Sequence, residues 1–323
     1  MDDPGDWVLA VDLGGSRLRM AVVNRGGVFL HQRQQPTPKT RLDILAQMEA
    51  LLRQGQAWAE QAGQKVIGIG ISTGGRVDFA RGEVVDATAL LPDWHRVPLR
   101  DWARQRLELP AWVDNDGNCA ALAELWFGAG QDCHHFLNLV IGTGIGGGVV
   151  INRQVFRGAG FAAGELGHLS VDPQGPICSC GNWGCVELFA SGSGLAQLAQ
   201  TLWDAGLLQF THRPIAAAHE INAQDVGEAA RQGHPLAQDL LRRAGRLLGT
   251  ALTNLLHTLN PERVIIGGPV IDAGSLYWQS LVQTVQERTM ATAQVPLVRS
   301  PLTDAGLLGA AALIWQERVT SCL

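Results

Sequence analysis

Short apolar runs that end in glycine recur along the chain and alternate with helical stripes. The first run covers residues 7–11, and it is followed by the turn Asp12-Leu-Gly-Gly-Ser16 and a second apolar run at 18–23. Strand, tight turn, strand is the simplest interpretation, and it exposes backbone N–H groups at the turn. Other apolar runs predict strands at 66–71, 111–113, 136–141, 263–266 and near 297–299.

Helical periodicity fills the intervals between these strands. Between 43 and 63, apolar residues fall at 44, 45, 48, 51 and 52, with Asp43 as the expected N-cap. Similar patterns predict helices at 99–107, 119–127, 192–205, 222–232, 236–259, 275–289 and from about 306 onward. Pro235 suits the first turn of one of them. Because strands alternate with helices throughout, the predicted class is α/β.

Composition narrows the kind of protein but not its chemistry. The chain has 323 residues, of which 46% are apolar and 17% charged, as in ordinary soluble domains. A net charge of −5 gives no basic surface and argues against a nucleic-acid partner. No apolar run reaches the roughly 20 residues that a membrane helix needs, and the acidic N-terminus does not resemble a secretory signal. We therefore expect a cytoplasmic protein with no membrane partner.

One short segment, 164–187, collects four metal-binding side chains between two acids. His168, Cys178, Cys180 and Cys185 offer one imidazole and three thiolates, the donor set of a closed tetrahedral structural zinc site. Such a site leaves no open position for a water, so we interpret the metal as structural. Reduced thiols also fit a cytoplasmic protein better than a disulfide framework does. The flanking Glu165 and Glu187 indicate a loop that holds polar side chains against a ligand.

Three glycine turns follow apolar strands, at 14–15, 142–148 and 267–268. Backbone amides at such turns can bind phosphates, although a single glycine turn is also what a hairpin needs. Asp12 and Thr143 stand where they could contact magnesium-bound phosphates, and three such turns together favour nucleotide binding. None has the Walker A spacing or the dinucleotide-binding glycine pattern, which argues against P-loop enzymes and dehydrogenases. The similar turns after 7–11 and 136–141 also indicate two related halves.

Asp116 lies just past the end of the predicted strand 111–113, within the polar cluster Asp114-Asn-Asp-Gly-Asn118. On spacing alone, this cluster is explained as a turn with a helix N-cap. The functional interpretation is a carboxylate that accepts a proton from an alcohol. The residues themselves leave both interpretations open.

Together these motifs resemble the ROK family of repressors, open reading frames and sugar kinases. The resemblance rests on Asp-Leu-Gly-Gly-Ser (12–16), Asn-Asp (115–116), Gly-Thr-Gly-Ile-Gly-Gly-Gly (142–148), Gly-Glu-Leu-Gly-His (164–168) and Cys-x-Cys-Gly-x-x-Gly-Cys-x-Glu (178–187). Longer stretches at 70–77, 112–124 and 254–261 are similar to the N-acetylmannosamine kinase half of the animal bifunctional UDP-N-acetylglucosamine 2-epimerase/N-acetylmannosamine kinase. The resemblance implies an actin/hexokinase-like (ribonuclease H-like) ATPase fold with two α/β domains around a central cleft. The domains would be 1–116 with about 304–323, and 117–303 with the zinc loop.

The resemblance also implies roles for individual residues. Asp116 would be the general base that activates the 6-hydroxyl of N-acetylmannosamine for attack on ATP. The sugar would be held by Gly75, Arg76, Thr88, Asn115, Asp116, Glu165, His168 and Glu187. ATP and its magnesium would be held by Asp12, Gly14, Gly15, Ser16, Arg17, Gly142, Thr143 and Gly144, with Gly267 and Gly268 near adenosine. His168 would serve both zinc and sugar through its two ring nitrogens, and the enzyme would be a homodimer.

Two departures from the family pattern are visible, and rival functions remain. Ser16-Arg17 replaces the commoner Thr-Lys or Thr-Asn, and Pro269 follows the adenosine-site glycines. A glucokinase or another ROK hexose or N-acetylhexosamine kinase shares every general motif. A ROK repressor needs a helix-turn-helix domain ahead of Asp12, where only eleven residues stand. A sugar sensor without catalysis fits less well, because Asp116 is retained.

Overall fold

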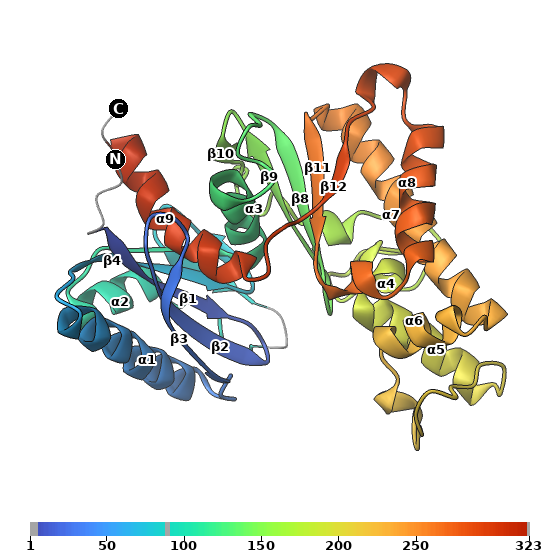
Figure 1. Cartoon of the computed structure of the whole chain (residues 1–323), viewed down its shortest axis with the longest axis horizontal. Coiled ribbons are helices and arrows are strands. Elements are labelled where there is room, and N and C mark those ends of the chain that lie inside the picture. Colours follow the sequence, from blue (N-terminus) through green and yellow to red (C-terminus); the bar gives the residue numbers. More distant parts are fainter. Residues whose placement is uncertain (1–5, 88–90, 322–323) are drawn as a thin grey trace. The chain divides into compact units, whose positions relative to one another are not determined.

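The computed structural model describes residues 6–87 and 91–321 and shows an α/β protein built on two five-stranded sheets (Figure 1). The α/β class expected from alternating strands and helices is confirmed. The chain separates into two compact units. Unit 1 comprises Met1–His134, Gly148–Gly164 and Pro301–Leu323, and unit 2 comprises His135–Gly147 and Glu165–Ser300.

The first sheet has the strand order β3-β2-β1-β4-β7. Its strands are β1 (Trp7–Leu13), β2 (Arg17–Val23), β3 (Phe29–Pro36), β4 (Val66–Thr73) and β7 (Ala111–Asn115). Strands β1, β2 and β3 pair antiparallel, whereas β4 runs parallel to both β1 and β7. The carboxyl ends of β1, β4 and β7 therefore lie at one edge of the sheet, and each ends in a polar residue or a glycine turn.

The second sheet repeats this arrangement with the order β10-β9-β8-β11-β12. Its strands are β8 (Phe136–Ile141), β9 (Ile145–Ile151), β10 (Gln154–Val155), β11 (Arg263–Gly267) and β12 (Leu297–Arg299). Again an antiparallel pair stands at one side and parallel neighbours follow, β11 beside β8 and β12 beside β11. The shared order of the two sheets agrees with the two related halves expected from the repeated glycine turns.

Helices cover the first sheet where the periodicity predicts them, with two changes at their beginnings. They are α1 (Arg41–Gln61), α2 (Leu99–Leu107), α3 (Asp116–Phe127) and α9 (Ala305–Ser321). The N-cap of α1 is Thr40 and not Asp43, because the Thr40 hydroxyl accepts from the Asp43 backbone N–H at 3.2 Å. Helix α3 begins at Asp116 and not at Cys119. The small hairpin β5 (Arg76–Asp78) and β6 (Glu83–Asp86) was not predicted from the sequence.

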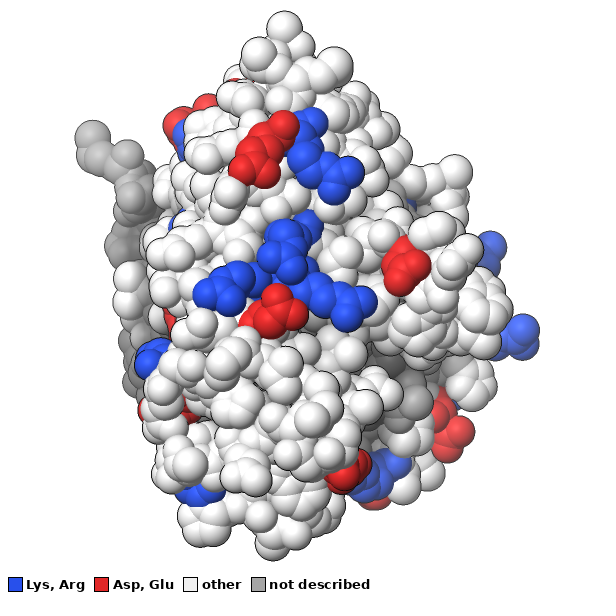
Figure 2. Space-filling model, turned by 90° about the vertical axis from the view of Figure 1, so that its right-hand side faces the viewer, with Lys and Arg blue, Asp and Glu red and all other residues white. Residues whose placement is uncertain are grey.

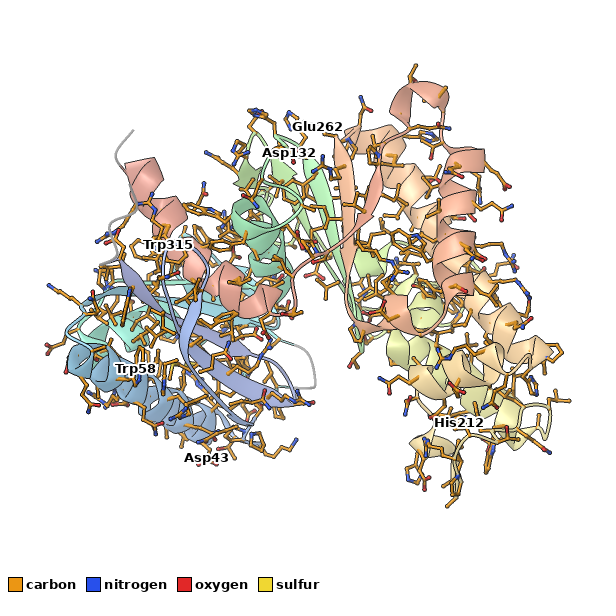
Figure 3. The ribbon with its side chains drawn as sticks, in the orientation of Figure 1. Asp43, Trp58, Asp132, His212, Glu262 and Trp315 are labelled. Carbon is orange, nitrogen blue, oxygen red and sulfur yellow. The ribbon has the colours of Figure 1, made fainter. Side chains whose placement is uncertain are left out.

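Aromatic side chains fix these helices on unit 1 (Figure 3). Trp58 of α1 stacks on Trp7 of β1 with ring centroids 5.6 Å apart. Trp315 of α9 is buried and meets Trp126 and Phe127 of α3, with both centroid distances 6.0 Å. Helix α3, which begins with the proposed base, is therefore held along its length by α9.

Helices of unit 2 pack on one another through close glycine contacts. They are α4 (Glu187–Ala190), α5 (Gly192–Asp204), α6 (Ala223–Arg231), α7 (Pro235–Leu259) and α8 (Ser275–Arg288), and Pro235 occupies the first turn of α7 as predicted. A β-carbon at Gly245 of α7 would lie 2.3 Å from the Tyr277 carbonyl oxygen of α8. Glycine is therefore required where these two helices cross. Short 3₁₀ turns cover Leu166–His168, Ala218–Glu220, Pro269–Asp272 and Ala291–Ala293.

The compact units do not have the bounds of the domains expected from the sequence, since α3 lies in unit 1. The expected domains were a smaller one, 1–116 with the C-terminal helix at about 304–323, and a larger one, 117–303, with the zinc loop. That division stays a prediction.

Several charged side chains on unit 2 make local contacts. Figure 2 shows basic side chains gathered near the middle of one face with acidic groups among them. On α7, Arg246 lies 3.9 Å from Asp239, and Arg242 donates to Gln238 at 3.1 Å. Within the described residues, no helix is both long and apolar enough to cross a membrane.

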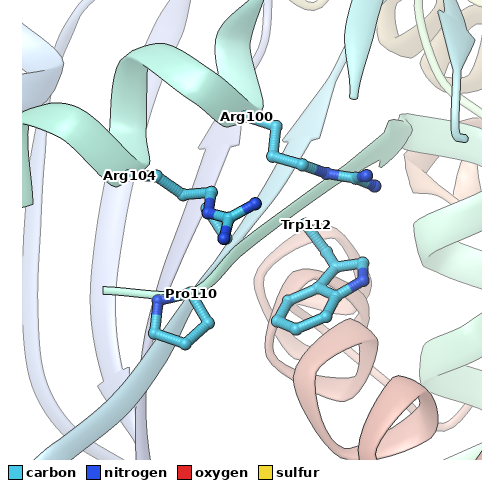
Figure 4. A pocket seen from close by; sticks show the side chains of 5 residues that line it. Arg100, Arg104, Pro110 and Trp112 are labelled. Atoms are coloured by element: carbon cyan, nitrogen blue, oxygen red, sulfur yellow. The ribbon is translucent and has the colours of Figure 1, made fainter. Parts of the chain in front are cut away.

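A small pocket of about 120 Å³ lies where α2 packs on the beginning of β7 (Figure 4). Its lining residues are Arg100, Arg104, Pro110, Ala111 and Trp112. Arg100 already donates to the carbonyl oxygens of Phe79 and Ala80 at 2.6 and 2.9 Å, so its guanidinium fixes the turn before β6. The pocket lies at the amino end of β7, and the polar cluster lies at its carboxyl end.

Candidate functional site

Asp116 is the first residue of α3, directly after strand β7 ends. Asn115 caps the helix, because its side-chain oxygen accepts from the backbone N–H groups of Gly117 at 2.8 Å and Asn118 at 3.2 Å. The Asp116 carboxylate also accepts from the Gly117 N–H at 2.9 Å. A helix N-terminus favours negative charge, so this position suits an ionised carboxylate. The N-cap interpretation is therefore correct for Asn115, and it is compatible with a functional Asp116.

The glycine loop after β4 is joined to Asn115. The Asn115 side-chain N–H donates to the Gly75 carbonyl oxygen at 2.9 Å. Gly75 has φ +98°, and a β-carbon there would lie 2.4 Å from the Asp86 carbonyl oxygen, so the loop requires glycine. Arg76 pairs with Asp86 at 2.6 Å, and its hydrogen bond to that carboxylate raises the pKa of Arg76. Thr88, the remaining sugar-binding candidate of this region, lies outside the described residues.

The first glycine turn joins β1 and β2 as predicted. The Gly14 N–H donates to the Arg17 carbonyl oxygen at 3.0 Å, and the Thr37 hydroxyl donates to the Gly14 carbonyl oxygen at 2.7 Å. Gly15 is half-buried at this tip, and Ser16 and Arg17 are exposed. These contacts hold the turn open to solvent, as a phosphate-binding turn requires.

Asp12, at the base of this turn, is held by an arginine that the sequence analysis did not single out. Arg19 donates to one Asp12 carboxylate oxygen and also pairs with Asp304 at 2.7 Å. The Ser72 hydroxyl donates to the other Asp12 oxygen at 2.9 Å. Burial works against the Arg19 charge, but the two carboxylates outweigh burial and raise its pKa.

In unit 2, the Gly142–Gly144 turn is fixed from the segment that follows the zinc-ligand cluster. The Gly192 N–H donates to the Gly142 carbonyl oxygen at 2.8 Å. The Ser193 N–H and hydroxyl both donate to the Thr143 carbonyl oxygen, at 3.1 and 2.7 Å. This leaves the turn with its backbone shape set before any ligand binds.

Gly267 and Gly268 lie next to that turn within the same unit. Strand β11 runs parallel to β8 with Gly267 opposite Val140. Gly268 has φ +97°, and a β-carbon there would lie 2.4 Å from the Ile141 carbonyl oxygen. Two of the predicted phosphate- and nucleotide-binding turns are thus adjacent. Pro269 begins the following 3₁₀ turn, a position that tolerates proline.

His168, Cys178, Cys180 and Cys185 come together as the sequence predicts. Their ligand atoms all lie within 4.8 Å of one another. The Cys178 sulfur is 3.5 Å from His168 Nδ1, and the sulfurs of Cys180 and Cys185 are 3.6 Å apart. Two sulfurs on a tetrahedral zinc, each about 2.3 Å from the metal, lie about 3.8 Å apart. The donor set and its spacing therefore fit zinc.

The thiols of this cluster differ in their surroundings. Burial raises the pKa of Cys185 to about 12, whereas the backbone N–H of Asn182 and the neighbouring thiols outweigh burial and lower the pKa of Cys180. Gly181 has φ +88° and closes the tight turn between the ligands, donating its N–H to the Cys178 carbonyl oxygen at 2.9 Å.

The acids that flank the cluster point to different partners. His168 turns Nδ1 toward Cys178 and Nε2 toward the Glu165 carboxylate, 3.9 Å away, which is too long for a direct hydrogen bond. Glu187, the first residue of α4, accepts the Ile145 N–H at 2.7 Å through one carboxylate oxygen. Glu187 thus joins the metal-binding segment to the strand that leaves the Gly142–Gly144 turn.

Comparison with known proteins identifies the family. The profile of the ROK family matches residues 8–317. The chain belongs to the ROK family. The glucokinase of Thermotoga maritima is 33% identical over 97% of this chain and 98% of its own length, and the N-acetylmannosamine kinase of Escherichia fergusonii is 32% identical over 96% and 99%. A putative xylose repressor of Caldicellulosiruptor sp. is 32% identical over 95% of this chain and 77% of its own length.

Among solved structures, a ROK family glucokinase from Streptomyces griseus in complex with glucose and AMPPNP is similar along nearly the whole chain. Its TM-score is 0.80, with 33% identity over 96% of this chain and 99% of that protein. Together with the two sheets, this establishes the actin/hexokinase-like fold. The expected similarity to the N-acetylmannosamine kinase half of the animal bifunctional enzyme stays a prediction.

Sequence reasoning missed the side chains that support this ROK site. Asp114 is buried and accepts from Arg157, and Ser191 and Ser193 stand behind the Gly142–Gly144 turn. Asp114 adjoins a recognised motif, and it was noted only as part of a polar cluster. Arg157 is 43 residues away in the chain and belongs to none of the motifs, so no local pattern reveals it.

Proposed function

We propose that this ROK family sugar kinase transfers the γ-phosphoryl group of ATP to the 6-hydroxyl of N-acetylmannosamine, giving N-acetylmannosamine 6-phosphate and ADP. The observation that carries the proposal is the first turn of α3. There Asp116 follows the Asn115 cap, and the Asn115 side chain donates a hydrogen bond to the Gly75 carbonyl oxygen. Because the turn that carries the Asp116 carboxylate is fixed in this way, it suits a base that must meet a sugar hydroxyl in one orientation.

In the proposed reaction, Asp116 accepts the proton of the sugar 6-hydroxyl while that oxygen attacks the γ-phosphorus. The bond to the β,γ-bridging oxygen breaks, and ADP leaves. Phosphoryl transfer demands mainly alignment and charge stabilisation from the protein. Asn115 and Arg76 are proposed sugar contacts from the same unit, together with Gly75 and Thr88.

The phosphates of ATP are assigned to the glycine turns. The backbone N–H groups of 14–17 and 142–144 would donate to phosphate oxygens, and Gly267 and Gly268 would lie near adenosine. The Asp12 carboxylate supplies hard oxygen donors of the kind that magnesium prefers. One carboxylate oxygen accepts a single hydrogen bond, from Ser72, and retains capacity for a further ligand, whereas the other accepts two from Arg19. Magnesium bound with ATP would neutralise phosphate charge.

Zinc is proposed as a structural ion bound by His168, Cys178, Cys180 and Cys185, whose spacing fits it. The ion would stabilise the fold of segment 164–187. Glu165, His168 Nε2 and Glu187 are the proposed sugar-hydroxyl ligands of this segment. Orienting His168 through Nδ1 leaves Nε2 available for that role.

The choice of N-acetylmannosamine rests on the 70–77 loop sequence and agrees with the name of the Escherichia fergusonii relative. Glucose is the second candidate, since a relative of nearly equal identity is a glucokinase. A coupled ADP-release assay with N-acetylmannosamine, N-acetylglucosamine, mannose and glucose separates them. The proposal expects the highest kcat/KM for N-acetylmannosamine, and a higher value for glucose would refute it.

A further inference from the structure

Strand β7 ends at a buried ion pair directly beside the proposed base. Asp114 has a side chain that is 1% exposed, and Arg157, which follows β10, has one that is 19% exposed. The Arg157 Nη2 and Nε atoms lie 2.7 and 2.8 Å from one Asp114 carboxylate oxygen. The guanidinium also lies over the ring of Phe79, 3.6 Å from its centroid. Arg157 is therefore held both by charge and by stacking.

The second carboxylate oxygen of Asp114 organises the first turn of α3. It accepts the side-chain N–H of Asn118 at 3.0 Å and the backbone N–H of Asn115 at 2.8 Å. Asp116 stands between these two residues in the chain. The orientation of its turn is thus set by a carboxylate that is itself fixed by Arg157.

A buried ion pair is a weak source of stability, because both charges lose their hydration. Stabilisation of the fold is therefore a weak explanation for this ion pair, and its effect on the neighbouring turn is the stronger one. Removal of one partner leaves the other charge buried and uncompensated. Without Arg157, that charge would be the Asp114 carboxylate, which lies two residues from Asp116.

Several other ionisable groups lie near the first turn of α3 and contribute to its electrostatic environment. Besides burial, the carboxylates of Asp114, Asp12 and Asp116 all raise the pKa of the buried Cys119 thiol in α3. Asp12 is paired with Arg19, and Asp114 with Arg157. The remaining charged side chains on elements packed against β7 and α3 are Arg76, Asp78, Glu83 and Asp86 of β5–β6, Asp304 before α9, Glu124 of α3, Arg100, Asp101, Arg104 and Arg106 of α2, and Glu317 and Arg318 of α9.

We propose that Arg157 is a positioning residue for the Asp116 base: it neutralises Asp114, which in turn fixes the Asn115–Asn118 turn. This inference rests on the proposed role of Asp116. Arg157 itself takes no proton and is not assigned to the substrate. Its effect is to keep the carboxylate beside the base from disfavouring the ionised form of Asp116.

The test compares variants that remove either the positive or the negative charge of the Asp114–Arg157 pair. Arg157→Met leaves Asp114 unbalanced, so the acid limb of the kcat/KM–pH profile moves to higher pH and kcat falls about 10- to 100-fold. Asp114→Asn leaves Arg157 unbalanced and moves the same limb to lower pH. The double variant Asp114→Asn/Arg157→Met returns the acid limb close to its wild-type position. Arg157→Lys keeps the positive charge, so its acid limb also stays close to the wild-type position.

Arg153→Met is the matched control, because Arg153 lies in the turn between β9 and β10, four residues before Arg157, and its guanidinium donates to the carbonyl oxygens of Gln131 and Cys133. Its pH profile is expected to match that of the wild type. The assays use ATP with whichever panel sugar gives the highest turnover. Shifts in the same direction for both single variants, or no shift in either, overturn the proposal.

Three further outcomes separate the positioning role from the proposed base. If Arg157→Met does not fold, as judged by circular dichroism, Asp114→Asn still tests the inference, and an unshifted acid limb in that variant overturns it. If Asp116→Asn retains wild-type turnover, the proposed base is wrong, and the positioning role falls with it. An inactive Asp116→Asn variant alongside an unshifted Arg157→Met variant refutes only the positioning role.

Discussion

Asp116 occupies a position where three local effects favour an ionised carboxylate. It begins α3, it follows the Asn115 cap, and it accepts the Gly117 N–H at 2.9 Å. Asp114, by contrast, is buried and saturated with donors from Arg157, Asn115 and Asn118. Two aspartates two residues apart thus have different surroundings, and Asp116 is the one proposed for proton transfer.

Replacement of Asp116 by Asn is expected to lower kcat by about 10²- to 10⁴-fold, the usual contribution of general base catalysis. Asparagine keeps the shape of the side chain and cannot accept the proton. The coupled assay measures turnover, and zinc content and thermal unfolding show whether the fold is intact. Asp101→Asn is the matched control, since Asp101 also stands in the first turn of a helix. A folded Asp116→Asn enzyme with near-normal kcat contradicts the assignment.

At this scale, contiguous motifs were predictable and their distant partners were not. The cluster of His168 with three cysteines follows from spacing alone. The pairing of Asp12 with Arg19 depends on the register of β1 and β2. The pairing of Asp114 with Arg157 depends on a segment 43 residues further along the chain. The N-cap of α1 was wrong by three residues, because Thr40 and Asp43 can both cap a helix and only geometry selects between them.

Among the elements, the metal-binding segment has the most direct link to the proposed site. It runs from Glu165 through the four ligands to Glu187, which binds the Ile145 N–H beside the Gly142–Gly144 turn. The sequence predicted the ligand set, and the geometry fits it. The hydrogen bond from Ile145 to Glu187 was not predictable, because it joins two loops through a backbone group that carries no sequence signal.

Replacement of Cys185 by Ser is expected to remove zinc and to raise KM for the sugar about tenfold, equivalent to about 1.4 kcal/mol. Sugar affinity is expected to fall because Glu165, His168 and Glu187 become disordered once the ion no longer fixes their segment. Elemental analysis gives the metal content, and initial rates give KM. Cys133→Ser is the control, since Cys133 is buried outside the cluster. Full activity in a zinc-free Cys185→Ser protein would show that the ion does not support the site.

The buried carboxylate of Asp225 ties the first turn of helix α6 to the segment before it. Asp225 accepts from Arg213 at 2.7 Å, from the ring of His212 at 2.8 Å and from the Asn222 N–H at 2.9 Å (Figure 3 labels His212). Burial alone would raise the pKa of Asp225, but these donors lower it to about 2. The ionised group therefore stabilises the fold above pH 3.8, its ordinary pKa, and this contribution is lost as pH falls toward 2.

Asp225→Asn is accordingly expected to lower the free energy of unfolding by about 2 kcal/mol at neutral pH. The difference between wild type and variant should shrink as the pH drops below about 4. Urea unfolding at several pH values measures it. Asp239→Asn, which removes an exposed carboxylate 3.9 Å from Arg246, should change stability by less than about 0.5 kcal/mol. A pH-independent Asp225 effect would contradict this account.

At the level of the whole molecule, the repeated strand order explains why the proposed site draws on equivalent turns. The β1–β2 and β8–β9 turns stand at corresponding places in two sheets of the same order. The sequence indicated this repeat through its glycines. It did not reveal β3, the β5–β6 hairpin or β10, because these short or polar strands lack an apolar run.

The homodimer stays a prediction at this scale. Sedimentation equilibrium at several protein concentrations tests it directly. A mass near twice 34.6 kDa supports the dimer, and a monomer mass at all concentrations refutes it.

Competition between sugars gives the decisive test of N-acetylmannosamine as the substrate. Wild-type enzyme receives limiting ATP and an equimolar mixture of N-acetylmannosamine, N-acetylglucosamine and glucose, and phosphorus NMR identifies the products. We expect N-acetylmannosamine 6-phosphate as the main product, with the phosphate coupled to the C6 protons. A mixture dominated by glucose 6-phosphate, or one with no phosphorylated sugar, would contradict it.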